Sequence, residues 1–98
     1  MKTKPPFKIE LCLTELINRA EQGINQLEAF NAYGETALHS TISALANDHG
    51  LLIKRVSEPH THRHGALTHF NRYSLNTIDS MAHAKRIIAS YAKLRGVA

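Results

Sequence analysis

Residues 23–55, GINQLEAFNAYGETALHSTISALANDHGLLIKR, combine two helix patterns, a short turn between them and a strand pattern at the end. Asn25 can cap a helix, and Glu28 follows three residues later, at the spacing of a capping box. We therefore expect a short helix over residues 26–31. The turn after it is expected at Gly34, because glycine adopts turn conformations at no steric cost. The buried side of this short helix is expected to consist of two apolar residues, Leu27 and Phe30.

The second helix of this stretch is expected to begin at Glu35 or Thr36 and to end before Gly50. Its apolar residues recur at spacings of four and three, which is typical of one buried helix face. These residues are Leu38, Ile42 and Leu45. The opposite face would present small polar side chains that suit contacts with base edges and phosphates. They are Thr36, His39, Ser40, Ser43 and Asn47.

After Gly50 the apolar pattern changes to a period near two, which indicates β-structure. We expect a first strand over residues 51–57 and a second strand over residues 68–75. The polar residues 58–67 between them would form a loop. The two strands and this loop together predict a β-hairpin.

Two further helices are expected on either side of this stretch, over residues 7–20 and 77–94. The domain would span residues 7–75 after a flexible tail at residues 1–6. The segment 76–98 would add a C-terminal helix that either packs on the domain or forms a homodimer. The apolar stripe of this last helix is expected to consist of Ile78, Met81, Ala84, Ile88, Tyr91 and Ala92.

Three helices followed by a β-hairpin are the element order of a winged helix-turn-helix domain. The quoted stretch also resembles the small helix-turn-helix domains of bacteriophage and prophage proteins over about residues 10–75. The resemblance implies an α+β fold, mainly α, with the hairpin as the wing and an extra C-terminal helix. The positions that carry it are Asn25, Glu28, Ala29, Gly34, Leu38, Ile42, Leu45, Gly50 and Ile53.

The resemblance also implies a function. Such a chain would be a cytoplasmic DNA-binding protein of bacterial or phage type, either a small transcriptional regulator or an architectural factor. The helix that carries Leu38 and Ile42 would read the major groove of double-stranded DNA. Domains of this kind often have an arginine near the middle of that helix, whereas this chain has Ser40, Thr41 and Ser43 there. Any sequence preference would therefore come from small polar side chains.

The distribution of charge indicates a polyanion-binding surface in the second half of the chain. The protein has 98 residues, with 12 Lys and Arg against 8 Asp and Glu. Residues 1–53 carry a net charge of −2, and residues 54–98 carry +6. Lys and Arg contacts to phosphates release counterions and supply most non-specific affinity for DNA. The wing residues expected to make such contacts are Lys54, Arg55, His62, Arg63, His64 and Arg72.

A metal-responsive regulator is one alternative. His60, His62 and His64 alternate along the chain, so an extended backbone would place the three imidazoles on one side. Imidazoles arranged in this way can bind zinc, copper or nickel. His69 or Glu58 would have to supply a fourth ligand.

Another alternative is a winged-helix adaptor that binds protein through the same surfaces and does not bind DNA.

An enzyme is not expected, because no phosphate-binding glycine loop, HExxH motif or GxSxG motif occurs. No cofactor is expected either. The single cysteine, Cys12, cannot form an internal disulfide, which is typical of a cytoplasmic protein. No apolar run is long enough to predict a membrane span.

Overall fold

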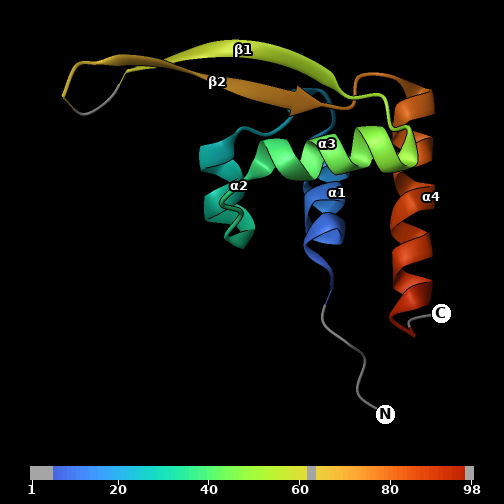
Figure 1. Cartoon of the computed structure of the whole chain (residues 1–98). Helices are drawn as coiled ribbons and strands as arrows, with labels where there is room; N and C mark the ends of the chain where they lie inside the picture. The colour runs from blue at the N-terminus through green and yellow to red at the C-terminus, as the bar shows by residue number, and fades with distance from the viewer. Residues whose placement is uncertain (1–5, 62–63, 97–98) are drawn as a thin grey trace.

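The computed structural model describes residues 6–61 and 64–96 and has an α+β fold that is mainly helical (Figure 1). This confirms the coarse part of the expectation, an α+β fold that is mainly α. The elements in chain order are α1 (Lys8–Arg19), the 3-10 turn η1 (Ala20–Gln22), α2 (Gln26–Tyr33), α3 (Leu38–His49), β1 (Lys54–Thr61), β2 (Leu67–Ser74) and α4 (Ile78–Leu94).

The hydrophobic core lies between the helices and the base of the hairpin. On α3 the buried residues include Leu38, Ile42 and Leu45, which confirms the expected apolar face. Helix α1 and helix α4 run side by side in opposite directions, so the start of α1 and the end of α4 lie on the same side of the molecule (Figure 1). The other buried apolar residues are Cys12, Leu13, Leu16, Ile24, Ala29, Leu51, Tyr73, Leu75, Ala84 and Ile87.

Helix α2 begins with the capping box that its sequence predicts. The backbone N–H of Glu28 donates to Oδ1 of Asn25 at 2.9 Å, and the backbone N–H of Asn25 donates to Oε1 of Glu28 at 3.0 Å. The helix ends at Gly34, which has the left-handed conformation expected of a turn glycine, with φ 76°. These local signals determine where α2 starts and stops.

The expected buried side of α2 is wrong. Leu27 is 43% exposed and Phe30 is 57% exposed, whereas Ala29 is fully buried. Because the small Ala29 side chain faces the core, α2 can approach it closely. Leu27 and Phe30 are three residues apart and share the other side of the helix. Two large apolar side chains therefore lie at the surface.

The first strand of the hairpin lies farther along the chain than its sequence predicts. Strands β1 and β2 pair in antiparallel register from Lys54 opposite Ser74 to Thr61 opposite Leu67. Residues 58–61, expected in a loop, belong to β1, while Leu51 and Ile53 precede the strand. The proline at position 59 is compatible with this extension, because a two-stranded sheet has only edge strands. The hairpin is thus an extended arm that projects beyond α2 (Figure 1).

The base of the hairpin is fixed to the segment between η1 and α2. Ile24 and Tyr73 form an isolated antiparallel bridge, with N···O distances of 2.8 and 2.9 Å. Gly23 makes this approach possible, because a Cβ atom there would lie only 2.3 Å from the carbonyl oxygen of Tyr73. The φ of Gly23, 66°, also favours glycine. The hairpin and the helices are therefore joined directly through the backbone.

Helix α4 packs on α1. Much of its expected stripe faces the core, because Ala84 is buried and Met81, Ile88 and Tyr91 are partly buried against the core. Ile78 is 88% exposed, and Ile87, which lies outside the expected stripe, is 5% exposed. The guanidinium of Arg95 donates to the Glu10 carboxylate at 2.7 Å and links the end of α4 to α1. The buried residues of α4 are Ser80, Ala84 and Ile87. The expected stripe is therefore wrong at Ile78 and misses Ile87.

Within residues 6–61 and 64–96, no helix combines the length and apolar character needed to cross a membrane.

Candidate nucleic-acid interface

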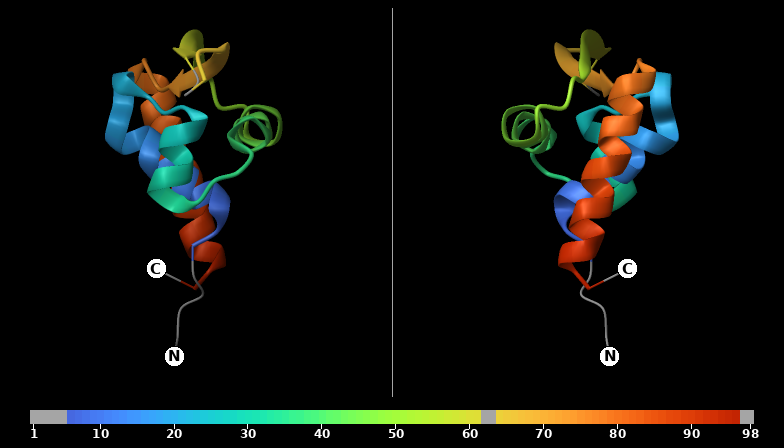
Figure 2. Two further views of the ribbon diagram at one scale, coloured as in Figure 1. Left: turned by 90° about the vertical axis from the view of Figure 1, so that its left-hand side faces the viewer. Right: turned by 90° about the vertical axis from the view of Figure 1, so that its right-hand side faces the viewer.

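Helix α3 presents the polar face that its sequence predicts. It lies at one edge of the helical body, below the hairpin, and is seen nearly end-on in Figure 2. Thr36 lies in the turn before α3 rather than in the helix. Asp48 shares the exposed surface near the end of the helix. The five expected contact residues are all exposed, namely Thr36, His39, Ser40, Ser43 and Asn47.

The hairpin has two different faces. Residues directly opposite each other in an antiparallel pair share a face, and successive residues alternate between faces. The register therefore places one set of side chains, here called the paired face, at Lys54, Val56, Glu58, His60, Thr68, Phe70, Arg72 and Ser74. The other set, here called the open face, consists of Arg55, Ser57, Pro59, Thr61, Leu67, His69, Asn71 and Tyr73.

The paired face contains a network of ions centred on Arg72. Its Nε donates to Oε2 of Glu58 at 2.9 Å, and its terminal nitrogen donates to Oε1 of Glu28 at 2.9 Å. The same nitrogen donates to the backbone carbonyl of Gln22 at 3.0 Å. The amide of Asn25 donates to the second oxygen of Glu58 at 2.8 Å. Arg72 therefore connects the hairpin to α2 and to the turn before it.

The protonation of both carboxylates reflects this network. The hydrogen bond from Arg72 lowers the pKa of Glu58, and the hydrogen bond from Asn25 adds to this effect. Partial burial alone would raise the pKa of Glu28, but the hydrogen bonds from Arg72 and from the Asn25 backbone outweigh it and lower the pKa. Both groups are thus ionised at neutral pH. Their negative charges compensate the positive charge of Arg72. Arg72 is one of the residues predicted from the sequence to contact a phosphate.

The open face is exposed at every position except Tyr73, and none of its eight residues is acidic. Arg55 lies over the Tyr73 ring, with its guanidinium carbon 5.4 Å from the ring centroid. This contact holds the cation on the open face. The open face therefore carries one cation at its base and no side-chain carboxylate.

A groove of about 320 Å³ separates the start of α3 from β2. His39 contributes from α3, and His69 and Asn71 contribute from the open face. The structure thus brings together two surfaces that are distant in the sequence. The full lining is Gln26, Leu38, His39, His69, Phe70, Asn71 and Tyr73.

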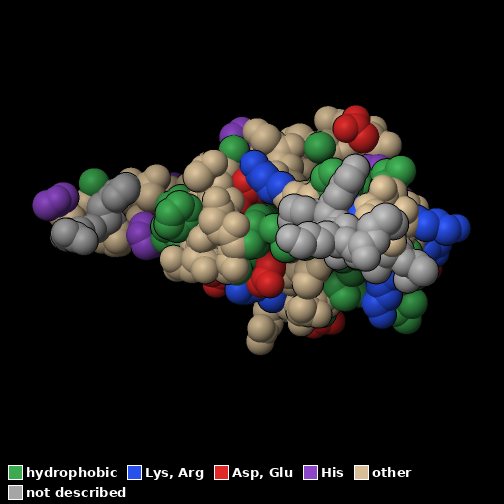
Figure 3. All heavy atoms as spheres, turned by 90° about the horizontal axis from the view of Figure 1, so that it is seen from below, with side chains coloured by type: hydrophobic (Ala, Val, Ile, Leu, Met, Phe, Trp, Pro, Cys, Tyr) green, Lys and Arg blue, Asp and Glu red, His purple; other side chains and the backbone are tan. Residues whose placement is uncertain are grey.

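The remaining wing candidates have different surroundings. Lys54 is exposed at the start of β1, on the paired face, and His64 is exposed in the turn after the described part of β1. His62 and Arg63 lie outside the described residues. Seen from below, histidine side chains mark the hairpin end of the molecule (Figure 3).

The described residues do not form a metal site around the candidate ligands. His60 is half-buried and packs edge-to-face on Phe70, with ring centroids 5.2 Å apart. His62 lies outside the described part of the chain. Within that part, no group of three His, Cys, Asp or Glu side chains is placed to hold a metal ion.

The basic residues of α4 form a separate exposed region. Lys85, Arg86 and Lys93 are exposed, and several Lys and Arg side chains lie at the α4 end in Figure 3. Arg95 is different, because it is largely buried against Glu10.

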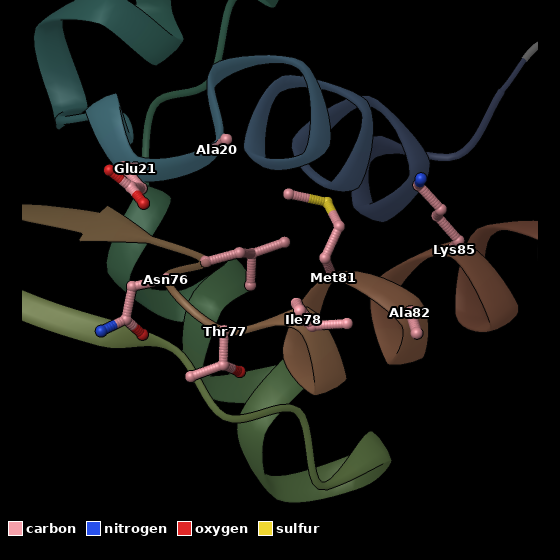
Figure 4. Close-up of a pocket in the computed structure, with 9 residues that line it drawn as sticks. Ala20, Glu21, Asn76, Thr77, Ile78, Met81, Ala82 and Lys85 are labelled. Carbon is pink, nitrogen blue, oxygen red and sulfur yellow. The ribbon is translucent and has the colours of Figure 1, made fainter.

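A second pocket, of about 390 Å³, lies between η1 and the start of α4 (Figure 4). The Met81 side chain points from α4 toward η1, and Lys85 lies at one end. The pocket shares no lining residue with the groove beside α3. It is therefore not part of the candidate interface.

Two buried groups inside the helical body have structural surroundings. Burial raises the pKa of the Cys12 thiol to about 11, so the thiol stays protonated at neutral pH. Burial would also raise the pKa of Glu35, but hydrogen bonds from Lys8 and Thr41 outweigh it and lower the pKa. The Lys8 ammonium is 2.8 Å from Glu35, and the Thr41 hydroxyl donates to Glu35 at 2.6 Å. Glu35 thus ties the turn before α3 to α1 and α3, a role for which the sequence offers no local signal.

Comparison of the chain with protein-family models, with curated proteins and with solved structures found no significant match.

Proposed function

We propose that this chain is a winged helix-turn-helix protein that binds double-stranded DNA, as a small bacterial or phage transcriptional regulator or architectural factor. The hairpin directly follows α3, where a wing would stand after a recognition helix. The bridge between Ile24 and Tyr73 fixes the hairpin to the segment before α2. Both features support one unit made of α2, α3 and the hairpin.

The observation that carries the DNA proposal is the segregation of charge between the two hairpin faces. Glu58 lies on the paired face, compensated by Arg72, and the open face has no acidic residue. The open face borders the groove beside the exposed polar side of α3. A surface that approaches phosphates must avoid uncompensated carboxylates, because like charges repel at close range.

In this proposal the parts of the interface have different roles. The small polar side chains of α3 contact base edges in the major groove. Arg55 and His64 contact phosphates, which position the protein on the duplex. Lys54 lies on the paired face and is outside this contact. Arg72 acts through the protein itself, because it holds the hairpin against α2 and is not free to neutralise a phosphate.

A salt titration tests the proposal. Binding of a random-sequence DNA duplex is measured by fluorescence anisotropy at about 50 and 200 mM salt for the wild type, Arg55→Gln and Lys93→Gln. Arg55 and Lys93 are both exposed cations, but Lys93 is on α4. We expect wild-type affinity to fall steeply with salt, and Arg55→Gln to reduce the slope of log K against log salt by about 0.9. Lys93→Gln should keep the wild-type slope.

The titration also distinguishes the adaptor alternative, which has an observation of its own. Leu27 and Phe30 form an exposed apolar pair on α2 that could pack against another protein. An adaptor predicts no salt-dependent affinity for DNA. That result in the wild type would overturn the DNA proposal and favour the apolar pair as the functional surface.

A further inference from the structure

The groove between α3 and β2 is lined by two imidazoles that come from different elements. His39 lies in the first turn of α3, and His69 lies in the middle of β2 on the open face. Both side chains are exposed, and both line the same groove of about 320 Å³. They are 30 positions apart in the sequence, so the fold alone brings them together.

The groups that surround the groove place no uncompensated negative charge against a bound anion. None of the residues that line it is acidic. From α2, only Gln26 faces it, and its amide is engaged with the Glu35 carbonyl at 2.6 Å and the Leu38 N–H at 2.7 Å. The Glu35 carboxylate itself is bound by Lys8 and Thr41.

The charged groups farther along the same elements also do not oppose the binding of an anion in the groove. From β1, Arg55 stands on the open face and lies over Tyr73, one of the lining residues. The acidic residue of α3, Asp48, is nine positions from His39, about 14 Å along a helix axis. At that distance its charge is largely screened at physiological salt.

We propose that this groove seats one phosphodiester strand of duplex DNA, and that His39 and His69 donate hydrogen bonds to its phosphate oxygens from opposite sides. This inference rests on the proposed DNA-binding function and adds the position of the backbone and its recognition chemistry. An imidazole gains a positive charge in the range of pH 5 to 8, and a charged imidazole donates from both ring nitrogens. Proton uptake by the two groups is therefore linked to DNA binding, and affinity rises as the pH falls.

The experiment compares the wild type, the double variant His39→Gln/His69→Gln and the control His83→Gln. His83 is on α4 and lines neither the groove nor the open face. Anisotropy titrations on the same DNA duplex are run at two salt concentrations, at pH 7.5 and at pH 5.5, within the range where imidazoles titrate. Circular dichroism at both pH values verifies that each variant is folded.

We expect the slope of log K against log salt to steepen in the wild type as the pH falls, because each protonated imidazole adds about one phosphate contact. His39 and His69 together should account for up to about two of this change, and His64 for the rest. His83→Gln should behave as the wild type. The double variant should show most of this change removed, while it still binds DNA at pH 7.5.

The outcomes separate the two proposals. If the double variant keeps the full pH dependence, or if the wild-type slope is the same at both pH values, DNA binding stands and the histidine site is overturned. If the wild type binds no DNA at either pH, both proposals are overturned.

Discussion

The two faces of one hairpin differ in what their charged side chains contact. On the paired face, Arg72 binds both Glu58 and Glu28, and these ion pairs hold the hairpin against the helices. On the open face, Arg55 lies over an aromatic ring and no carboxylate is present among the eight residues. The number of cations in a segment therefore does not define a binding surface. The strand register decides which of them remain available to a ligand.

The same lesson applies to the charge of the second half of the chain. Its net charge of +6 includes Arg72 and Arg95. In the folded protein these two cations bind Glu28 and Glu10, which belong to the first half. Part of the basic excess therefore stabilises the fold, and the candidate interface depends on fewer cations than the sequence suggests.

The largest expected effect comes from breaking the paired face. Arg72→Ala should lower the free energy of unfolding by about 2–3 kcal/mol, because it leaves two partly buried carboxylates without their partner. Arg55→Ala, the matched change on the open face, should cost less than about 1 kcal/mol, the value of an exposed cation–π contact. Urea denaturation of both variants measures the difference. Equal losses would mean that the two faces contribute alike to stability.

A second effect concerns the pH dependence of that loss. The pKa values of Glu28 and Glu58 are lowered in the folded protein, so the stability they add is present above their ordinary pKa near 4.5. It is lost as the pH falls through the lower folded values. The difference in unfolding free energy between the wild type and Arg72→Ala should therefore shrink by more than half from pH 7 to pH 3, a range that spans the ordinary carboxyl pKa values. A constant difference in urea denaturation across this range would show that Arg72 stabilises the hairpin by other means.

Local features of the fold could be predicted from the sequence, because they depend on residues a few positions apart. The capping box of Asn25 and Glu28, the turn at Gly34 and the buried face that includes Ile42 are of this kind. The orientation of α2 could not be predicted, because Leu27 and Phe30 are apolar and only the tertiary packing of Ala29 determines which side is buried.

The candidate site shows the same limit. The exposed polar face of α3 follows from helical periodicity and could be predicted. The partners of Arg72 could not, because Glu28 lies 44 residues away and meets it only through the fold. The extension of β1 through Pro59 likewise depends on pairing with β2. Because the two faces of the hairpin depend on this register, their difference in charge could not be read from the sequence.

The smallest expected effect is a change in affinity for duplex DNA caused by one added carboxylate. It tests directly whether the open face, and not the paired face, meets DNA. Ser57 and Val56 are adjacent, exposed and on opposite faces of β1. Ser57→Glu should weaken duplex binding about fivefold, the equivalent of about 1 kcal/mol for one repulsive charge near a phosphate. Val56→Glu adds the same charge on the paired face, opposite Arg72. It should leave the affinity for DNA within about twofold of the wild type, because this face does not meet the duplex and an exposed ion pair with Arg72 contributes little. Anisotropy titrations of the two folded variants on one duplex measure this contrast. If both variants lose the same affinity for DNA, or if Val56→Glu loses more, the open face is not the face that binds DNA.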